Sequence, residues 1–219
     1  MSVIEDYCIR HTSTVGGPLN DIYRSVALHT ANPHMASSPL QGGFLQMIAA
    51  ILRPDVAVEI GAHAGYGSAC IASGMGGHGI LHLVEANPEY QTLICRHAEM
   101  AGISDRIRLH IGQAKDIIPS LPDGIGLAYV DADKENYDEY YSLLLPKMKK
   151  GGILLLDNML WYGRVVDEEA HTSPSTSELR CQREARLLHQ LNNRITLDER
   201  VENILLPLRD GIMLCLVRK

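Results

Sequence analysis

The chain has 219 residues, of which 46% are hydrophobic and 21% are charged, and its formal net charge is -6 at pH 7. This length fits one α/β domain with a sizeable core, and the acidic balance argues against a protein that binds nucleic acid through its overall charge. The five cysteines are odd in number, widely spaced and without a CxxC pair, which argues against disulfides and a structural zinc site. No apolar run approaches the roughly 18 residues that span a membrane, and the N-terminus lacks a signal-peptide pattern, so we expect a cytoplasmic protein without a membrane partner.

The N-terminal quarter is expected to consist of helices around one loop. Residues 1–30 place apolar side chains at helix-like spacing, whereas residues 29–43 are rich in turn-forming residues and are expected to form a loop. A further helix is predicted after this loop, because apolar side chains recur on one helical stripe from Phe44 to Leu52. This helix is expected to stop at Pro54.

Short apolar runs alternate with helical segments in the next hundred residues. The spacing between these runs leaves room for a helix each time, which predicts βαβ units and a parallel sheet covered on both faces. The expected strands are Val56–Ile60, Ile80–Val84, Ile107–Ile111, Leu127–Val130 and Ile153–Leu156.

The C-terminal pattern breaks this alternation. The apolar runs Val201–Leu206 and Ile212–Val217 are joined by PLRDG, a hairpin signal, so the last strand is expected to run antiparallel to its neighbour. The segment SELRCQREARLLHQLNN precedes them, has Ser175 and Glu178 at capping-box spacing, and is expected to form a helix. The predicted fold class is therefore α/β, a Rossmann-like, doubly wound and mostly parallel seven-stranded sheet with an antiparallel C-terminal hairpin strand.

A glycine-rich turn follows the first expected strand, in VAVEIGAHAGYGSACIA (residues 56–72). Glu59 is followed by Gly61, Gly65 and Gly67, and glycines at such a turn let the backbone bend sharply and let a ligand approach it closely. The spacing G-x-x-x-G-x-G differs from the G-x-G-x-x-G of nicotinamide and flavin enzymes. The alternative is that these glycines end the strand for local reasons.

Glu85 ends the second expected strand, 24 residues after Gly61. An acid at this place can accept both ribose hydroxyls of a bound nucleoside, although a solvated acid at a strand end is the alternative. No Lys-Ser/Thr pair follows the glycine-rich turn, and no Tyr-x-x-x-Lys occurs in the chain. A nucleoside cofactor without phosphates therefore fits better than a dinucleotide.

Oxygen-bearing side chains follow two of the expected strands. Asp131 comes directly after the strand that ends at Val130, and Asp157 and Asn158 come directly after the strand that ends at Leu156. If these strands are neighbours, the three side chains meet at one edge of the sheet, and two carboxylates with an amide oxygen suit Mg²⁺. The alternative is that Asp157 and Asn158 cap a turn and that Asp131 caps the following helix.

Lys134 lies three residues beyond Asp131 and is expected to reach the same pocket. A free lysine amine has a pKa of about 10.4, which is too high for a base at neutral pH. A nearby divalent cation would lower this pKa and would also acidify a coordinated hydroxyl. Without the metal, Lys134 is better interpreted as a solvated residue in the first turn of a helix.

Together these motifs resemble the cation-dependent group of class I S-adenosylmethionine-dependent O-methyltransferases, which includes catechol and caffeoyl-CoA O-methyltransferases. The resemblance extends from MASSPLQGGFLQMI (residues 35–48) through VEIGAHAGYGSA, LVEANPE and GQAKDIIPSL to PLRDGIMLCLVRK, and its most specific parts are DADK-x-x-Y and GG-x-x-x-x-DN-x-L-W-x-G. It implies one methyltransferase domain over residues 1–219 and a homodimer. Helices and a loop in residues 1–54 are expected to close the site over a core of residues 55–219.

The resemblance implies a role for each matching position. Asp131, Asp157 and Asn158 match the ligands of Mg²⁺ or another divalent cation, and Lys134 matches the lysine held to be the base of the catechol enzyme. Tyr162 falls where the plant enzymes carry a substrate-contacting asparagine, so Lys134, Asn158 and Tyr162 are expected to face the substrate. The cofactor, S-adenosyl-L-methionine, is expected to contact Ser37, Glu59, Gly61, Ala62, Gly67, Ser68, Glu85, Ala114 and Asp131.

Two positions depart from the family pattern. Gly67 stands where the family usually has a serine, so one contact to the cofactor carboxylate is either lost or supplied by Ser68. Tyr162 replaces the asparagine of the plant enzymes and predicts a different substrate. The catechol enzyme also uses an acid late in its chain, and Asp210 is a candidate for that role. We do not assign Asp210 a role, because it lies in the predicted hairpin turn.

The predicted function is metal-dependent O-methylation of a hydroxyl with an adjacent oxygen, first of all in a small catechol-like molecule. The alternative is methylation of a 5-hydroxyuridine in tRNA, which the net charge disfavours. Arg180, Arg183 and Arg186 favour it, unless they form a solvated helix face. A third hypothesis is a nucleoside-binding protein without activity, in which Lys134 and the metal ligands are incidental. Residues 162–178 are expected to form the substrate rim.

Overall fold

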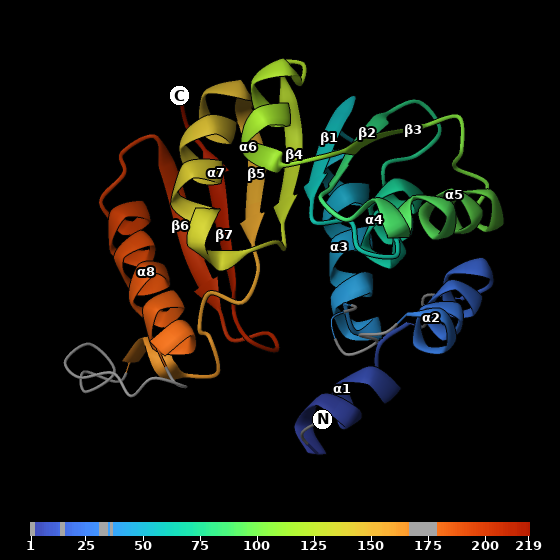
Figure 1. Ribbon diagram of the computed structural model, residues 1–219, viewed down its shortest axis with the longest axis horizontal. Helices are drawn as coiled ribbons and strands as arrows, with labels where there is room; N and C mark the ends of the chain where they lie inside the picture. The colour runs from blue at the N-terminus through green and yellow to red at the C-terminus, as the bar shows by residue number, and fades with distance from the viewer. Residues whose placement is uncertain (1–2, 14–15, 31–34, 36, 167–178) are drawn as a thin grey trace.

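A computed structural model describes residues 3–13, 16–30, 35, 37–166 and 179–219. Its centre is a seven-stranded sheet in the order β3-β2-β1-β4-β5-β7-β6 (Figure 1). All the strands expected from the sequence form, and the predicted fold class is confirmed. The strands are β1 (Val56–Ile60), β2 (Ile80–Glu85), β3 (Ile107–Ile111), β4 (Ile125–Val130), β5 (Met148–Leu156), β6 (Val201–Leu206) and β7 (Ile212–Val217).

The direction of the strands follows the sequence pattern. Strands β1 to β5 pair in parallel, whereas β7 pairs antiparallel with both β5 and β6. The chain moves outward from β1 through β2 to β3 and then returns to the other side of β1 with β4. The strand order therefore reverses between β1 and β4, and the crevice at the carboxyl ends of these strands is the place where such sheets bind ligands.

Helices cover both faces of the sheet. On one face of the sheet, strand residues pack against α6, α7 and α8. On the opposite face, strand residues pack against α2, α3, α4 and α5. None of the described helices is long and apolar enough to cross a membrane. The helices are α1 (Val3–Arg10), α2 (Pro18–His29), α3 (Pro39–Leu52), α4 (Tyr66–Gly74), α5 (Gln91–Met100), α6 (Ala114–Ile117), α7 (Tyr137–Leu144) and α8 (Leu179–Thr196). Short 3₁₀ turns lie at Pro88–Tyr90, Ile118–Ser120, Lys134–Asn136, Leu145–Lys147 and Arg164–Val166.

One expectation for the N-terminal region is wrong. The loop predicted over residues 29–43 ends earlier, because α3 begins at Pro39. The side chain of Ser38 accepts a hydrogen bond from the backbone N–H of Gln41, and the fixed φ of Pro39 suits the first helical position. The first turn of α3 therefore contains a buried polar residue, Gln41. The predicted capping box of α8 at Ser175 and Glu178 lies outside the described residues.

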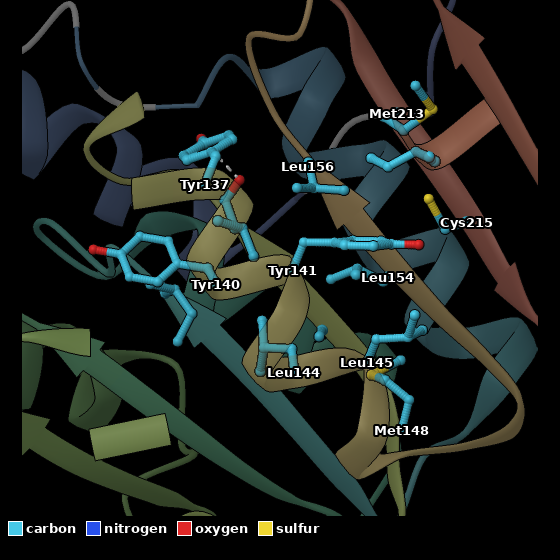
Figure 2. Close-up of a cluster of buried hydrophobic side chains, with 14 of the residues drawn as sticks. Tyr137, Tyr140, Tyr141, Leu144, Leu145, Met148, Leu154, Leu156, Met213 and Cys215 are labelled. Atoms are coloured by element: carbon cyan, nitrogen blue, oxygen red, sulfur yellow. Dashed lines mark hydrogen bonds between the residues drawn. The ribbon is translucent and has the colours of Figure 1, made fainter. Parts of the chain in front are cut away.

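Three tyrosines of α7 fill the core behind strands β4, β5 and β7. Tyr137, Tyr140 and Tyr141 are all at most 2% exposed. Figure 2 shows Tyr141 lying among Leu154 of β5 and the side chains of β7. This packing fixes the start of α7, and with it the turn Lys134–Asn136 that leads into the helix.

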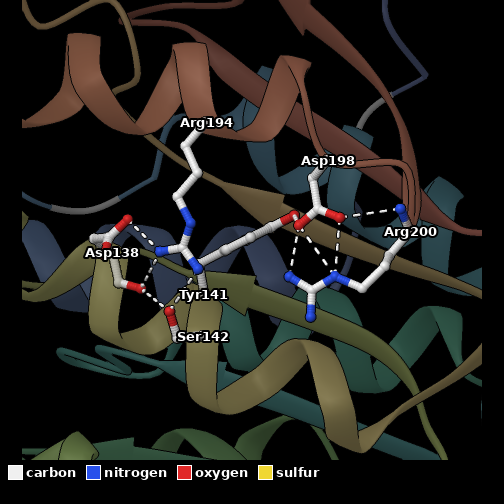
Figure 3. Close-up of polar contacts among 6 residues, drawn as sticks. All are labelled: Asp138, Tyr141, Ser142, Arg194, Asp198 and Arg200. Carbon is white, nitrogen blue, oxygen red and sulfur yellow. Dashed lines mark hydrogen bonds and ion pairs between the residues drawn. The ribbon is translucent and has the colours of Figure 1, made fainter.

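Polar contacts tie α8 to α7 and to the start of β6 (Figure 3). Arg194 of α8 donates to the carboxylate of Asp138 and, at 3.0 Å, to the hydroxyl of Ser142. The Tyr141 hydroxyl donates to Asp198 at 2.9 Å, and Asp198 also pairs with Arg200. The other end of α8 reaches the carboxyl edge of the sheet, so these contacts help to place it there.

Candidate functional site

The carboxyl ends of β1, β4 and β5 bring three predicted site residues side by side. Ile60 is in register with Val130, and Val130 is in register with Leu156. The next residues are Gly61, Asp131 and Asp157. The backbone N–H of Asp131 donates to Ile60 and that of Asp157 donates to Val130, each at 2.9 Å. The expectation that the two strands preceding the acidic residues are neighbours is confirmed.

A cavity of about 660 Å³ opens at this edge of the sheet. Its volume lies in the ordinary range for small-molecule and cofactor sites. The predicted site residues divide into two groups around it. Its lining includes Gly61, Glu85, Ala114, Asp131, Lys134, Asp157, Asn158 and Tyr162. The described lining does not include Ser37, Glu59, Ala62, Gly67 and Ser68, which are buried.

The glycine-rich turn after β1 brings backbone against backbone. Gly61 has φ of +89°, and a Cβ there would collide with the backbone carbonyl of Asp131. Gly65 has φ of +84° and precedes the first residue of α4. The local backbone therefore requires glycine at both positions. These glycines would be needed even if no ligand approached the turn.

Glu59 is a buried acid whose carboxylate is hydrogen-bonded by a neighbouring hydroxyl. It is 2% exposed, and burial is the main reason that its pKa rises to about 8. The hydroxyl of Ser68 donates to the Glu59 carboxylate, which opposes this rise. A Cβ at Gly67 would lie 2.5 Å from Oε1 of Glu59 and 3.8 Å from Oγ of Ser37. The glycine at position 67 thus leaves room for Glu59, and Ser68 is engaged with that acid rather than free for a cofactor carboxylate.

Glu85 is fixed at the cavity wall by backbone donors. The N–H of His63 donates to one carboxylate oxygen at 2.7 Å, and the N–H of Asn87 donates to the other at 2.8 Å. Burial raises the pKa of Glu85, while these hydrogen bonds act in the opposite direction. The backbone of Ala86 also hydrogen-bonds this carboxylate. The carboxylate is thus held in one orientation at the wall of the cavity.

Lys134 lies among the acids and aromatic rings of the site. Its Nζ is 3.1 Å from Oδ1 of Asp131 and 2.6 Å from the hydroxyl of Tyr137, and its side chain is 7% exposed. The amine also lies over the ring of Tyr137, 4.6 Å from its centroid, and 5.9 Å from that of Trp161. The prediction that Lys134 reaches the pocket of Asp131 is consistent with this placement, and the interpretation as a solvated lysine is wrong.

Asp131 and Asp157 influence each other. The pKa of Asp157 rises to about 6, mainly through burial and then through the negative charge of Asp131, while Lys134 acts against this rise. In the described part of the chain no group of three or more Asp, Glu, His or Cys side chains could hold a metal, so the candidate set consists of these two carboxylates and Asn158. This set fits a hard divalent cation, which takes carboxylate and amide oxygens and offsets the repulsion between the acids.

The alternative that these residues only cap a turn and a helix is supported for Asp157 but not for Asp131. Asp157 does accept the N–H of Asn158 at 2.7 Å, and Asn158 has φ of +59°, as in a local turn. Asp131 does not cap the following helical turn, because the residue before that turn is Asp133 and makes no side-chain capping bond. The turn contact at Asp157 uses one lone pair of its Oδ1. Asp131 and Asp157 both line the cavity.

Four further residues of the site were missed or left unassigned. Gln41, Arg209 and Asp210 line the cavity, and the hydroxyl of Tyr129 donates to Asp157 at 2.8 Å. The hairpin turn reaches the site because the carbonyl of Asp210 accepts the N–H of Leu160 at 2.8 Å. Lying in a hairpin turn was therefore no reason to exclude Asp210. A tyrosine in a strand that is otherwise apolar was the available signal for Tyr129.

Tyr162 and the pair Arg180 and Glu184 line the cavity, and a second ion pair involves the same helix, α8. Tyr162 is 76% exposed there. Arg180 of α8 is paired with Glu184 at 3.0 Å, and Arg183 is paired with Glu135 at 3.4 Å. Two of the three arginines that favoured RNA thus have acidic partners. The predicted rim loop beyond residue 166 lies outside the described residues up to residue 178.

The family model described as O-methyltransferase matches residues 11–218. The chain is 32% identical to caffeoyl-CoA O-methyltransferase 1 of Eucalyptus globulus, over 90% of this chain and 80% of that protein. It is 31% identical to the catechol O-methyltransferase of Niastella koreensis, over 68% of each chain. The SAH-bound methyltransferase PaMTH1 of Podospora anserina has the same fold, with a TM-score of 0.88 and 21% identity over 99% of this chain and 94% of that one.

Proposed function

This chain belongs to the O-methyltransferase family, and from that premise we propose that it transfers the methyl group of S-adenosylmethionine to a hydroxyl oxygen with a second oxygen beside it. The proposed substrate is a small catechol-like molecule, and the proposed second cofactor is Mg²⁺ or another divalent cation. The observation that carries the proposal is the meeting of Gly61, Asp131 and Asp157 at the edge of one cavity, with Lys134 beside Asp131.

The cofactor would lie along the carboxyl ends of β1 and β2. Glu85 presents two oxygens, each already oriented by a backbone donor, toward a ribose. Glu59 would accept the ammonium of the methionine part, since a nearby cation favours the ionised form of an acid whose pKa burial has raised. Gly61 allows close approach of the backbone, and Ala114 lies at the cavity wall. When bound, the cofactor supplies an electrophilic methyl group on a positive sulfur.

The acceptor would lie between the oxygen cluster and Lys134. Asp131, Asp157 and Asn158 would hold the cation, which when bound supplies positive charge that favours the ionised form of a hydroxyl. Lys134 lies within the same group of charges and would receive or screen the proton of that hydroxyl. Tyr162 and Trp161 would form the wall against the ring of the acceptor. Alignment of the reacting atoms in a site that excludes water would supply most of the acceleration.

The alternative acceptor, a tRNA base, is not proposed. Its support came from three arginines of α8, and the pairing of Arg180 with Glu184 and of Arg183 with Glu135 leaves little unbalanced positive charge on that face. The relatives whose names state a substrate are enzymes of caffeoyl-CoA and of catechol. Both names describe an aromatic molecule, which supports the small-molecule reading.

The test is transfer of labelled methyl from S-adenosylmethionine to caffeate and, separately, to bulk tRNA that lacks the methyl. Each reaction runs with Mg²⁺ and with a chelator. We expect label on caffeate that the chelator removes, and at least a hundredfold loss of activity in Asp131→Ala and Asp157→Ala. Asp55 is an exposed acid that directly precedes β1, at the amino end of the strand. Asp55→Ala is the control and is expected to retain activity.

Three outcomes would contradict parts of the proposal. Label that appears only on tRNA would overturn the proposed substrate. Label that persists in the chelator, or full activity in both aspartate variants, would overturn the metal site. Absence of any transfer from S-adenosylmethionine to either acceptor, with cofactor binding also absent by calorimetry, would overturn the proposed cofactor.

A further inference from the structure

A buried glutamine connects the N-terminal helix α3 to the oxygen cluster. Gln41 lies in the first turn of α3 and is 0% exposed. Its Nε2 donates to the hydroxyl of Tyr129 at 2.9 Å and to Oδ2 of Asp157. Its Oε1 accepts from Nη1 of Arg209 at 3.0 Å. Both hydrogens of the amide and its oxygen therefore have partners, although the residue was expected to lie in a loop.

These contacts leave the two oxygens of Asp157 in different states. Oδ2 accepts from Gln41 and from the Tyr129 hydroxyl, so both of its lone pairs are used. Oδ1 accepts only the N–H of Asn158 among the hydrogen bonds of the described residues, at 2.7 Å. One lone pair of Oδ1 is left for another partner. The carboxylate is thus held in one orientation, with one oxygen available to the cavity.

Arg209 determines which way the glutamine amide points. Its guanidinium donates to Oε1 of Gln41, so the amide nitrogen must face the acid. With the amide reversed, Oε1 would meet the carboxylate of Asp157 and the nitrogen would meet the cationic Arg209. The hairpin between β6 and β7 therefore fixes the glutamine, and the glutamine fixes the aspartate.

We propose that Gln41 is the positioning residue of the divalent-cation site, which orients Asp157 so that it offers a single oxygen, Oδ1, and that Arg209 acts through Gln41. The inference rests on the proposed function, because it assumes that Asp157 is a cation ligand. It adds that helix α3 and the C-terminal hairpin tune the affinity for the cation without contacting it. Loss of such an orienting partner typically weakens metal binding about 10- to 100-fold.

The test compares Gln41→Met with Gln46→Met on the same helix. Methionine approximates the length and volume of glutamine, so the exchange removes the hydrogen bonds while disturbing the packing little. Gln46 is only partly buried and its side chain does not line the cavity, so it serves as the matched control. Mn²⁺ binding to the full chain and binding of S-adenosylhomocysteine are both measured by isothermal titration calorimetry.

We expect Gln41→Met to raise the Kd for Mn²⁺ about 10- to 100-fold, with the Kd for S-adenosylhomocysteine within about twofold of wild type and Gln46→Met unchanged in both. Arg209→Met, a change at an exposed side chain, is expected to raise the Kd for Mn²⁺ in the same direction but less. Equal Mn²⁺ affinity in wild type, Gln41→Met and Arg209→Met would overturn the inference alone. No Mn²⁺ binding by the wild type would instead overturn the proposed metal dependence, so the two failures are distinguishable.

Discussion

The absence of a side chain at Gly67 leaves the space that the carboxylate of Glu59 occupies. Its backbone does not adopt a positive φ, so an alanine would suit the backbone. The constraint comes from space, since a Cβ would lie 2.5 Å from a carboxylate oxygen of Glu59. Ser68 at the next position donates to the same carboxylate. The carboxylate of Glu59 thus lies where a side chain at position 67 would begin.

Gly67→Ala is therefore expected to weaken cofactor binding. Overpacking at a buried position costs about 1–3 kcal/mol, and displacement of Glu59 would move the proposed partner of the cofactor ammonium. The Kd for S-adenosylhomocysteine should rise at least about tenfold, as measured by calorimetry. Gly77→Ala is the control, because a Cβ there has nothing within 4 Å. Wild-type affinity in Gly67→Ala would show that Glu59 does not hold the cofactor.

Several of the residues that the sequence identified at the site end a strand or directly follow one. Asp131 and Asp157 follow continuous apolar runs, so their place at the sheet edge depends only on the strand pattern and on the pairing of β4 with β5. Gln41 and Arg209 depend on how a helix start and a hairpin turn fold back in three dimensions. No local period or motif reports such contacts, which explains why Gln41 was predicted to lie in a loop.

A buried histidine joins two helices to the glycine-rich turn. His97 of α5 is 0% exposed, and its Nδ1 donates to the carbonyl of Ala64 at 2.6 Å. The other ring nitrogen accepts from the hydroxyl of Ser25 in α2 at 2.8 Å. Burial lowers the pKa of His97, and the charges of Arg96 and His29 act in the same direction. The neutral ring is thus the form that connects α2, α5 and the turn after β1.

The contribution of His97 to the free energy of unfolding should fall as the pH falls below about 6.5. In that range the unfolded chain binds a proton that the folded chain does not, so acid favours the unfolded state. We expect chemical denaturation between pH 7.5 and 5.5 to show a smaller loss of stability in His97→Gln than in wild type. The lowered pKa values of His82 and His110 act in the same direction as His97, and the raised pKa values of Glu59 and Asp157 act in the opposite direction. The difference between the two slopes therefore isolates the contribution of His97. An equal slope in wild type and His97→Gln would contradict the prediction.

The bounds of an element are predictable from the sequence where its burial is continuous. Strand β1 is buried along nearly its whole length, and its apolar run gives both of its limits. Strand β5 begins at Met148, before the expected Ile153, because residues 149–151 are exposed and interrupt the apolar pattern. The start of α3 depends on Ser38 and Pro39, residues that are equally common in loops.

The carboxyl ends of the strands lie on the same side of the molecule as the N-terminus. Figure 1 shows that the arrowheads of β4 and β5 point toward the end of the molecule where α1 lies. The N-terminal helices therefore lie at the end that carries the site.

Helix α3 exposes apolar side chains at the surface of the molecule. We propose that a second copy of this chain covers them. Met47 and Ile51 are 65% and 71% exposed, and they lie four residues apart on one face of the helix. The opposite face, with Leu45 and Ala49, is in the core. A helix with apolar side chains on both faces is typical of an interface between subunits.

Sedimentation velocity at micromolar concentration is expected to give a mass of twice 24.2 kDa for the wild type. Met47→Glu with Ile51→Glu should shift the protein to the monomer, because burial of two unpaired charges at an interface opposes association. Leu197→Glu adds one charge at a side chain that is 82% exposed outside α3, and it should remain dimeric. A monomeric wild type would refute the dimer. A dimeric double variant would contradict the assignment of the interface to α3.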